Sequence, residues 1–211
     1  MKTTPLITFF IAVALSVVPA AFAVPKYYEI GNASSVDAFS DPEPPFALVV
    51  HTALSPTLTG TNFILDDGQS FTFSFFDIWT DETHVNPDDT VPQNITATLD
   101  FFVPSVDPSI GGNTVGTSIF YGIIQYGQVT WNGPAIVTIP GDRQFSVTLS
   151  DEHFNFGFFG LNEGEKYGAT VEATVEQITS SNAVPETANT AMLFGAALVG
   201  VAFMARKRTI A

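Results

Sequence analysis

The sequence predicts an all-β domain, an antiparallel two-sheet β-sandwich of jelly-roll type, and two observations support this. Apolar and polar residues alternate with a period of two in several segments, so that one face of each segment can pack on a core. Turn-forming residues separate these segments at short intervals, as in sandwich folds. The residues expected to face inward are Phe71, Phe73, Phe75, Ile95, Ala97, Leu99, Phe101, Phe145, Val147, Leu149, Val171, Ala173 and Val175.

Glycine, proline and aspartate mark the turns between these segments. Residues 66–68 (Asp-Asp-Gly) predict a β-hairpin between residues 57–65 and 69–79. Residues 140–142 (Pro-Gly-Asp) predict a second turn between strands, and residues 132–134 (Asn-Gly-Pro) are expected to end the strand before them.

Three further segments need interpretation. Residues 170–178 also fit helical spacing, but their threonines and valines are β-branched and favour a strand. Residues 40–45 and 80–92 are rich in Asp and Pro and predict surface loops. Most of the 20 phenylalanines fall at strand positions expected to face inward, and we interpret them as core residues.

The central part of the chain is strongly acidic. The 211 residues include 21 acidic ones and seven Lys and Arg. Between residues 24 and 183, twenty acidic residues stand against Lys26, Arg143 and Lys166, which gives a net charge of −17. This charge repels phosphate backbones and excludes nucleic acid as a partner; it also suits a soluble exported protein. The absence of cysteine excludes disulfides and thiol catalysis.

Residues 1–23 predict a cleavable secretory signal peptide. Lys2 supplies the positive start, and residues 6–18 form an apolar run. Ala21 and Ala23 place small residues at the two positions that signal peptidase requires, so cleavage is expected after Ala23. The expected extracellular domain is then residues 24–180.

The other end predicts a membrane anchor. Residues 188–205 are mostly apolar and would span about 27 Å as a helix, enough for a thin bilayer. Arg206, Lys207 and Arg208 follow, within the basic tail of residues 206–211, and act as a stop-transfer charge that stays in the cytoplasm. The domain would be held outside by its C-terminus.

A short motif in the linker at residues 181–187 precedes this helix directly. It consists of Val184, Pro185, Glu186 and Thr187. A Pro-Glu motif, a helix rich in Gly, Ala and Leu and a basic cluster together resemble the PEP-CTERM sorting signal of Gram-negative bacteria. The resemblance covers residues 184–208 only. It implies transient attachment to the inner membrane, processing by an exosortase-like enzyme, and delivery to a cell surface or extracellular matrix that contains exopolysaccharide.

Two alternatives remain for the tail. The PEP-CTERM family usually has a second proline where this chain has Thr187. Residues 184–188 are also similar to a variant of the LPxTG signal for sortase-type anchoring to the cell wall, although Val and Ala replace its Leu and Gly. The other alternative is a plain anchor that is never cut.

The sequence carries little evidence of catalysis. His51, His84 and His153 come from different segments without a zinc-binding spacing. Asp151 and Glu152 are adjacent, and adjacent residues of a strand point to opposite faces, so they cannot form one acid–base pair. We expect no enzymatic activity, and a secreted glycan hydrolase is the alternative.

Two kinds of binding site are predicted from side-chain chemistry. Carboxylates clustered in loops suit a structural calcium ion, and the candidates are Asp66, Asp67, Asp77, Asp81, Asp88 and Asp89. Tryptophan and tyrosine combine an apolar ring with a polar group and suit carbohydrate, and the candidates are Trp79, Trp131, Tyr121 and Tyr126. The alternative is that these aromatic residues only pack in the core or at the edges of the sheets.

The sequence therefore predicts an exported, non-enzymatic structural or adhesive protein of the cell surface or biofilm matrix. The expected partners are signal peptidase, an exosortase-like enzyme, the inner membrane, exopolysaccharide and other copies of the chain. A carbohydrate- or calcium-binding module of the cell surface is the alternative.

Overall fold

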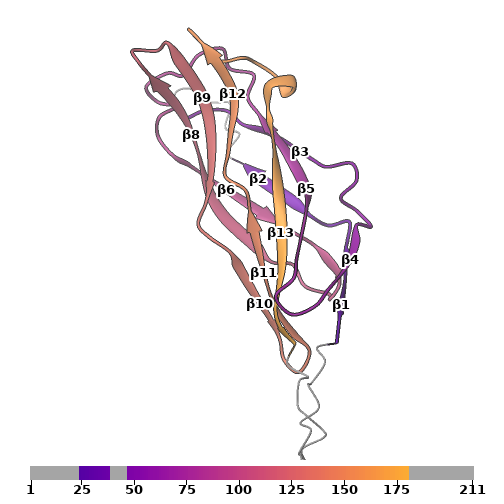
Figure 1. Ribbon diagram of the computed structural model, residues 1–211. Helices are drawn as coiled ribbons and strands as arrows, with labels where there is room; N and C mark the ends of the chain where they lie inside the picture. Colours follow the sequence, from indigo (N-terminus) through magenta and orange to yellow (C-terminus); the bar gives the residue numbers. More distant parts are fainter. Residues whose placement is uncertain (1–23, 39–46, 181–211) are drawn as a thin grey trace, which may run out of the picture. The chain divides into compact units, whose positions relative to one another are not determined.

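The alternating segments form strands in antiparallel sheets, as predicted (Figure 1). The computed structural model describes residues 24–38 and 47–180. The predicted signal peptide, the loop at residues 40–45, the sorting motif, the membrane helix and the basic tail lie outside these residues. Within the described part, the single helical element is the short 3-10 helix η1 (Glu165–Tyr167).

The described strands form three sheets, whereas two were predicted. One five-stranded sheet has the order β10 (Ala135–Ile139), β11 (Arg143–Leu149), β13 (Ala169–Ser180), β5 (Ser70–Trp79) and β3 (His51–Leu54). The other has the order β12 (Glu152–Phe158), β9 (Ile124–Trp131), β8 (Ser109–Ile119), β6 (Gln93–Thr98) and β2 (Ser35–Ala38). The small third sheet has the order β4 (Asn62–Leu65), β1 (Lys26–Ile30) and β7 (Phe101–Val103).

The core contains residues from all three sheets. Most residues predicted to face inward are buried, among them Val147 of β11, Val171 of β13 and Ile95 of β6. Tyr28 and Phe101 come from the small sheet. Burying a large apolar side chain stabilises a fold by about 1.5–3 kcal/mol, so this shared cluster holds the sheets together.

Strand β5 departs from simple alternation. Phe75 is buried, but Phe71 and Phe73 are more exposed and stack near Phe63 of β4. A β-bulge interrupts the pairing of β5 with β13 and leaves Phe75 and Phe76 both buried. The bulge therefore moves the inward face of the strand by one residue.

Two turn predictions and one strand prediction are confirmed. Residues 140–142 connect the hairpin of β10 and β11, and β9 ends before residues 132–134. Residues 170–178 lie within strand β13. This strand pairs on both sides, with β11 and with β5, so tertiary pairing reinforces its β-branched composition.

The hairpin predicted at residues 66–68 is wrong, although the turn exists. The backbone N–H of Gln69 donates to the carbonyl of Asp66 at 3.0 Å. However, β4 pairs with β1, while β5 pairs with β13 and β3. A local turn signal cannot specify the partner of each strand, and here the chain changes sheet at the turn.

The interpretation of the phenylalanines as core residues is only partly right. It holds for Phe63, Phe75, Phe76, Phe101, Phe145 and Phe154. It is wrong for the exposed side chains of Phe102, Phe120, Phe156, Phe158 and Phe159. Apolar residues occupy both faces of β12 and the turn that joins β8 to β9, so composition does not distinguish the inward face there.

The described chain begins and ends at the same end of the fold (Figure 1). Lys26, at the start of β1, forms an ion pair with Asp142 in the β10–β11 turn. Ser180, the last residue of β13, lies opposite Arg143 in the same region. The β8–β9 turn and the end of β12 lie at the opposite end.

Candidate functional site

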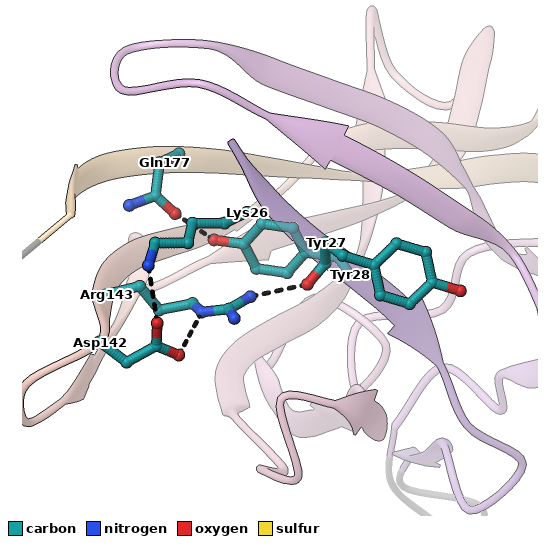
Figure 2. Close-up of polar contacts among 6 residues, drawn as sticks. All are labelled: Lys26, Tyr27, Tyr28, Asp142, Arg143 and Gln177. Atoms are coloured by element: carbon teal, nitrogen blue, oxygen red, sulfur yellow. Dashed lines mark hydrogen bonds and ion pairs between the residues drawn. The ribbon is translucent and has the colours of Figure 1, made fainter. Parts of the chain in front are cut away.

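Lys26, Asp142 and Arg143 form an ionic cluster where the described chain begins and ends (Figure 2). Lys26 Nζ lies 2.8 Å from Asp142 Oδ1, and Arg143 Nε lies 2.8 Å from Asp142 Oδ2. Arg143 Nη1 also donates to the backbone carbonyl of Tyr27 at 2.7 Å. Two of the three strong cations of the acidic domain thus converge on one carboxylate.

The contacts around this cluster indicate a structural role, in which it connects neighbouring strands. Hydrogen bonds from Lys26 and Arg143 hold the pKa of the Asp142 carboxyl below its usual value. Tyr28 donates its hydroxyl hydrogen to Gln177 Oε1 of β13, and burial raises the pKa of Tyr28 to about 12. Neither pKa lies near neutrality, where general acid–base catalysis works best. The cluster instead ties β1 to the β10–β11 hairpin and to β13.

The six carboxylates predicted to bind calcium do not come together. Asp66 and Asp67 precede β5, whereas Asp81, Asp88 and Asp89 follow it. A strand of ten residues separates the two groups by about 30 Å. The sixth residue, Asp77, lies near the end of β5 and accepts a hydrogen bond from Thr170 Oγ1 at 2.5 Å.

Residues 80–92 form a loop that is more buried than predicted. Asp89 is 2% exposed, and Asn86 donates its backbone N–H to Asp89 Oδ2 at 2.6 Å. Val49 donates its backbone N–H to Glu82 Oε1 at 2.7 Å. Burial raises the pKa of both Glu82 and Asp89, and the interaction between the two carboxyl groups contributes to the rise for Glu82. The loop therefore holds the buried carboxyl group of Asp89 beside the partly buried carboxyl group of Glu82.

This pair predicts a stabilising substitution. Because both pKa values are raised in the folded state, the pair favours folding at low pH and opposes it once the pH rises above the ordinary carboxyl range. The Asp89→Asn variant removes one charge, and its amide can donate to Glu82. We expect it to raise the free energy of unfolding by about 1 kcal/mol at pH 8 and by less at pH 4. Urea titration at both values measures this. Asp37→Asn, at an exposed position, is the control, and equal effects of the two variants would contradict the prediction.

Asn155 is the hub of a buried hydrogen-bond network, and the sequence did not predict it. Its side chain is fully buried and its backbone has a φ of 53°. Thr80 donates its backbone N–H to Asn155 Oδ1 at 2.9 Å. Asn155 Nδ2 donates to the carbonyls of Thr80, Asn162 and Gly164 at 3.1, 2.5 and 3.0 Å. One amide thus joins the start of the acidic loop to the connection that leads into β13. The tolerance of asparagine for positive φ was the available signal, but it does not identify the partners.

The histidines lie in separate environments. His51 Nε2 is 3.4 Å from Asp81 Oδ2, and its ring stacks on Trp79 with centroids 5.7 Å apart. His84 Nδ1 lies 3.0 Å from Thr83 Oγ1 in the acidic loop. His153 lies on β12. In the described residues, no group of three or more histidines and carboxylates could hold a metal ion. The calcium ion stays a prediction.

Asp151, one of the two adjacent carboxylates that the sequence analysis rejected as an acid–base pair, has a backbone partner in the fold. Asp151 Oδ1 accepts the backbone N–H of Trp131 at 2.9 Å, just before β12 begins at Glu152. Asp151 therefore holds the end of the adjacent strand β9. This contact gives Asp151 a structural role beside the strand.

The four aromatic residues proposed for carbohydrate separate into different sites. Trp131 packs against the core and donates its indole N–H to the carbonyl of Ser150 at 3.0 Å. Trp79 lies on β5 in the other large sheet. Tyr121 is fully exposed in the β8–β9 turn, and Tyr126 follows on β9. Trp131 also lies on β9, but its side chain packs against the core, so it does not share a surface with Tyr126.

A row of aromatic rings near Tyr126 was not predicted. The Tyr126 ring contacts that of His153, with centroids 4.5 Å apart. It also lies within 17° of parallel to the Phe156 ring, at 6.2 Å. Phe158 continues the row, 5.6 Å from Phe156. Pairing of β9 with β12 brings these residues together, which no local pattern could show.

Comparisons with known proteins identify no relative of this chain. No protein-family model, no curated protein and no solved structure gives a significant match to this chain. Among the residues that the structure describes, no helix is long and apolar enough to cross a membrane.

Proposed function

We propose that this chain is an exported protein of the cell surface or extracellular matrix, held at the membrane by its C-terminal helix until an exosortase-like enzyme processes the tail. Its role is structural or adhesive and non-enzymatic. The arrangement of the chain ends supports this proposal. The predicted signal cleavage site leads into β1, and the predicted tail leaves from β13, and both strands meet at the Lys26–Asp142–Arg143 cluster.

This arrangement suits a domain carried on a C-terminal anchor. If both processed ends leave from one end of the domain, neither crosses the surface at the opposite end. That end, formed by the β8–β9 turn and the end of β12, is then free to contact the surroundings of the cell. The acidic charge suits a domain that must stay soluble at high local concentration.

We further propose that the two five-stranded sheets are the layers of a jelly-roll-like sandwich. The support is the core cluster, which combines Val147 and Val171 of one sheet with Ile95 and Val129 of the other. The small sheet then covers one margin of the sandwich, because Tyr28 and Phe101 belong to the same cluster.

Intact-mass analysis of the native protein tests the sorting proposal. We expect an N-terminus at Val24 and a C-terminus shortened near residues 184–187. Deletion of residues 188–211 should release the protein from the membrane fraction, because the stop-transfer segment is then lost. Recovery of the unprocessed chain from the cytosol would overturn the proposal.

Two substitutions distinguish the candidate enzymes. Glu186 belongs to the Pro-Glu motif but stands at the variable position of the sortase-type signal, so Glu186→Ala should block only exosortase-like processing. Thr187→Val should block only sortase-type processing. Full-length, membrane-bound protein in the wild type and in both variants would instead indicate a plain anchor that is never cut.

A further inference from the structure

The outward face of the sheet β12–β9–β8–β6–β2 combines aromatic rings with uncharged polar side chains. Along each strand, alternate residues are buried, such as Val129 of β9 and Ile95 of β6. The residues between them face outward, and strand register places them in rows. One row contains Asn94, Asn113 and Thr130.

The neighbouring rows become progressively more aromatic. Gln128 pairs with Val115 on one side and with His153 on the other. Next to it, Thr117 pairs with Tyr126, whose ring lies beside that of Phe156.

The last row reaches the end of the fold. There Ile124 pairs with Ile119 and with Phe158. The face thus runs from amides and hydroxyls to exposed rings across one continuous sheet.

Charge separates this face from the rest of the domain. Among the outward strand positions of this sheet that the structure describes, only Asp37 on the edge strand β2 carries a charge. The domain as a whole has a net charge of −17, from twenty acidic residues against three cations. A face without charge on so acidic a protein favours an uncharged ligand, since an anionic polymer would be repelled by the surrounding carboxylates.

The turn beside this face holds further rings at a conformational cost. Phe120 and Tyr121 have φ values of 51° and 60°, and Phe159 has a φ of 59°. The left-handed region costs a residue with a β-carbon about 1–2 kcal/mol, and glycine or asparagine is the usual occupant. Phe159 donates its backbone N–H to the carbonyl of Ile123 at 2.8 Å, which joins its segment to the β8–β9 turn. Exposed aromatic side chains are therefore kept where smaller residues would be less strained.

From these observations we propose that this face binds an uncharged polysaccharide. The rings of Tyr126, Phe156 and Phe158 pack on the apolar C–H faces of sugar rings, and the amides and hydroxyls of the adjoining rows bond to sugar hydroxyls. A lipid bilayer or a second copy of this chain fits less well, because either would remove water from the row of Asn94, Asn113 and Thr130 without offering matched partners. The proposal goes beyond sorting and does not depend on the tail.

The test is electrophoresis of the full-length protein, in a zwitterionic detergent without a sugar headgroup, through gels that contain soluble polysaccharides. The uncharged probes are hydroxyethylcellulose, galactomannan, dextran and arabinoxylan, and the anionic probe is polygalacturonate. We expect at least one uncharged probe to retard the protein and the anionic probe to leave its mobility unchanged. Mobility unchanged by all four uncharged probes would overturn the proposal.

Matched variants locate the site. Tyr126→Ala and Phe158→Ala should each raise the dissociation constant for the polysaccharide about tenfold. Tyr126→Phe keeps an aromatic ring and should retain most of the affinity. Phe102→Ala is the control, because Phe102 and Phe158 are both 68% exposed but Phe102 lies on β7 of the small sheet. Thermal unfolding shows that each variant is folded.

Three results would contradict the assignment. One is equal loss of binding in the Phe102 and Phe158 variants. Another is sedimentation of the protein with phosphatidylcholine vesicles in a manner that Tyr126→Ala abolishes, which would indicate a lipid surface. The third is a concentration-dependent dimer in analytical ultracentrifugation that Phe158→Ala disrupts, which would indicate a contact between copies. Failure of tail processing would leave the expected binding unchanged, so the two proposals can fail separately.

Discussion

The Asn155→Asp variant is expected to lose about 3 kcal/mol or more of unfolding free energy at pH 8. Asn155 Nδ2 faces three backbone carbonyls, those of Thr80, Asn162 and Gly164, in a fully buried position. A carboxylate accepts hydrogen bonds but donates none, so its oxygens would face these carbonyls unpaired and away from water. Removing one partner from a buried polar network costs about 1–3 kcal/mol for each group left unpaired.

The pH dependence of this variant identifies the cause. Burial and the facing carbonyls should raise the pKa of the introduced carboxyl, so its protonated form is favoured in the folded state. A group with a raised folded pKa stabilises the fold at low pH and loses that contribution as the pH rises. The variant should therefore be closer to the wild type at pH 4 than at pH 8, as measured by urea unfolding.

Two more variants make the test specific. Asn155→Gly removes the same hydrogen bonds as Asn155→Ala, but glycine adopts the φ of 53° without strain. We expect the alanine variant to be less stable than the glycine variant by about 1 kcal/mol. Asn94→Asp, at an exposed position on β6, is the control for charge. If Asn94→Asp and Asn155→Asp were equally stable, Asn155 would not be the hub that its contacts indicate.

The second large effect is expected for Asp142→Asn, which should lose about 3 kcal/mol of unfolding free energy at pH 7. The Lys26 and Arg143 side chains are only 9% and 11% exposed, and Asp142 is the carboxylate that both contact. Removing one partner of a buried ion pair leaves an uncompensated charge and costs about 3–5 kcal/mol. We expect the lower end of this energy range because Asp142 itself is 35% exposed and partly screened by water.

This substitution should also change the response to acid. The pKa of Asp142 is lowered in the folded state, so its contribution is complete above the ordinary aspartate pKa of about 4 and is lost as the pH falls below it. The wild type should lose more stability than the variant between pH 5 and pH 3 in urea titrations. Asp37→Asn, which removes the same charge from an exposed site on β2, should differ little from the wild type at either pH. Parallel pH profiles for the wild type and Asp142→Asn would refute the role of the cluster.

Much of the secondary structure was predictable because it depends on local chemistry. Strand β11 places Phe145 and Val147 inward by simple alternation, and both are fully buried. The turn at residues 140–142 contains Gly141, whose φ of 76° suits glycine. Short-range periodicity and turn chemistry act within a few residues, so a single sequence contains the information.

The candidate sites were less predictable because they depend on contacts between distant residues. Asp66 and Asp89 looked alike as loop carboxylates, yet Asp66 lies at the β4–β5 turn and Asp89 is buried against its own loop. Lys26 and Asp142 are 116 residues apart, and only the pairing of sheets brings their side chains together. The row of Tyr126 and Phe156 likewise depends on the register of β9 with β12.

The amino-acid sequence was sufficient to predict that the central domain is built of antiparallel strands, that it is strongly acidic, and where several of its turns occur. These properties follow from residue type and spacing. The tertiary structure alone decided which strands pair, that β4 and β5 belong to different sheets, and which aromatic residues stay exposed. The physical reason is that a strand offers the same backbone hydrogen bonds to any partner, so its neighbours are selected by the side chains that the whole core must bury together.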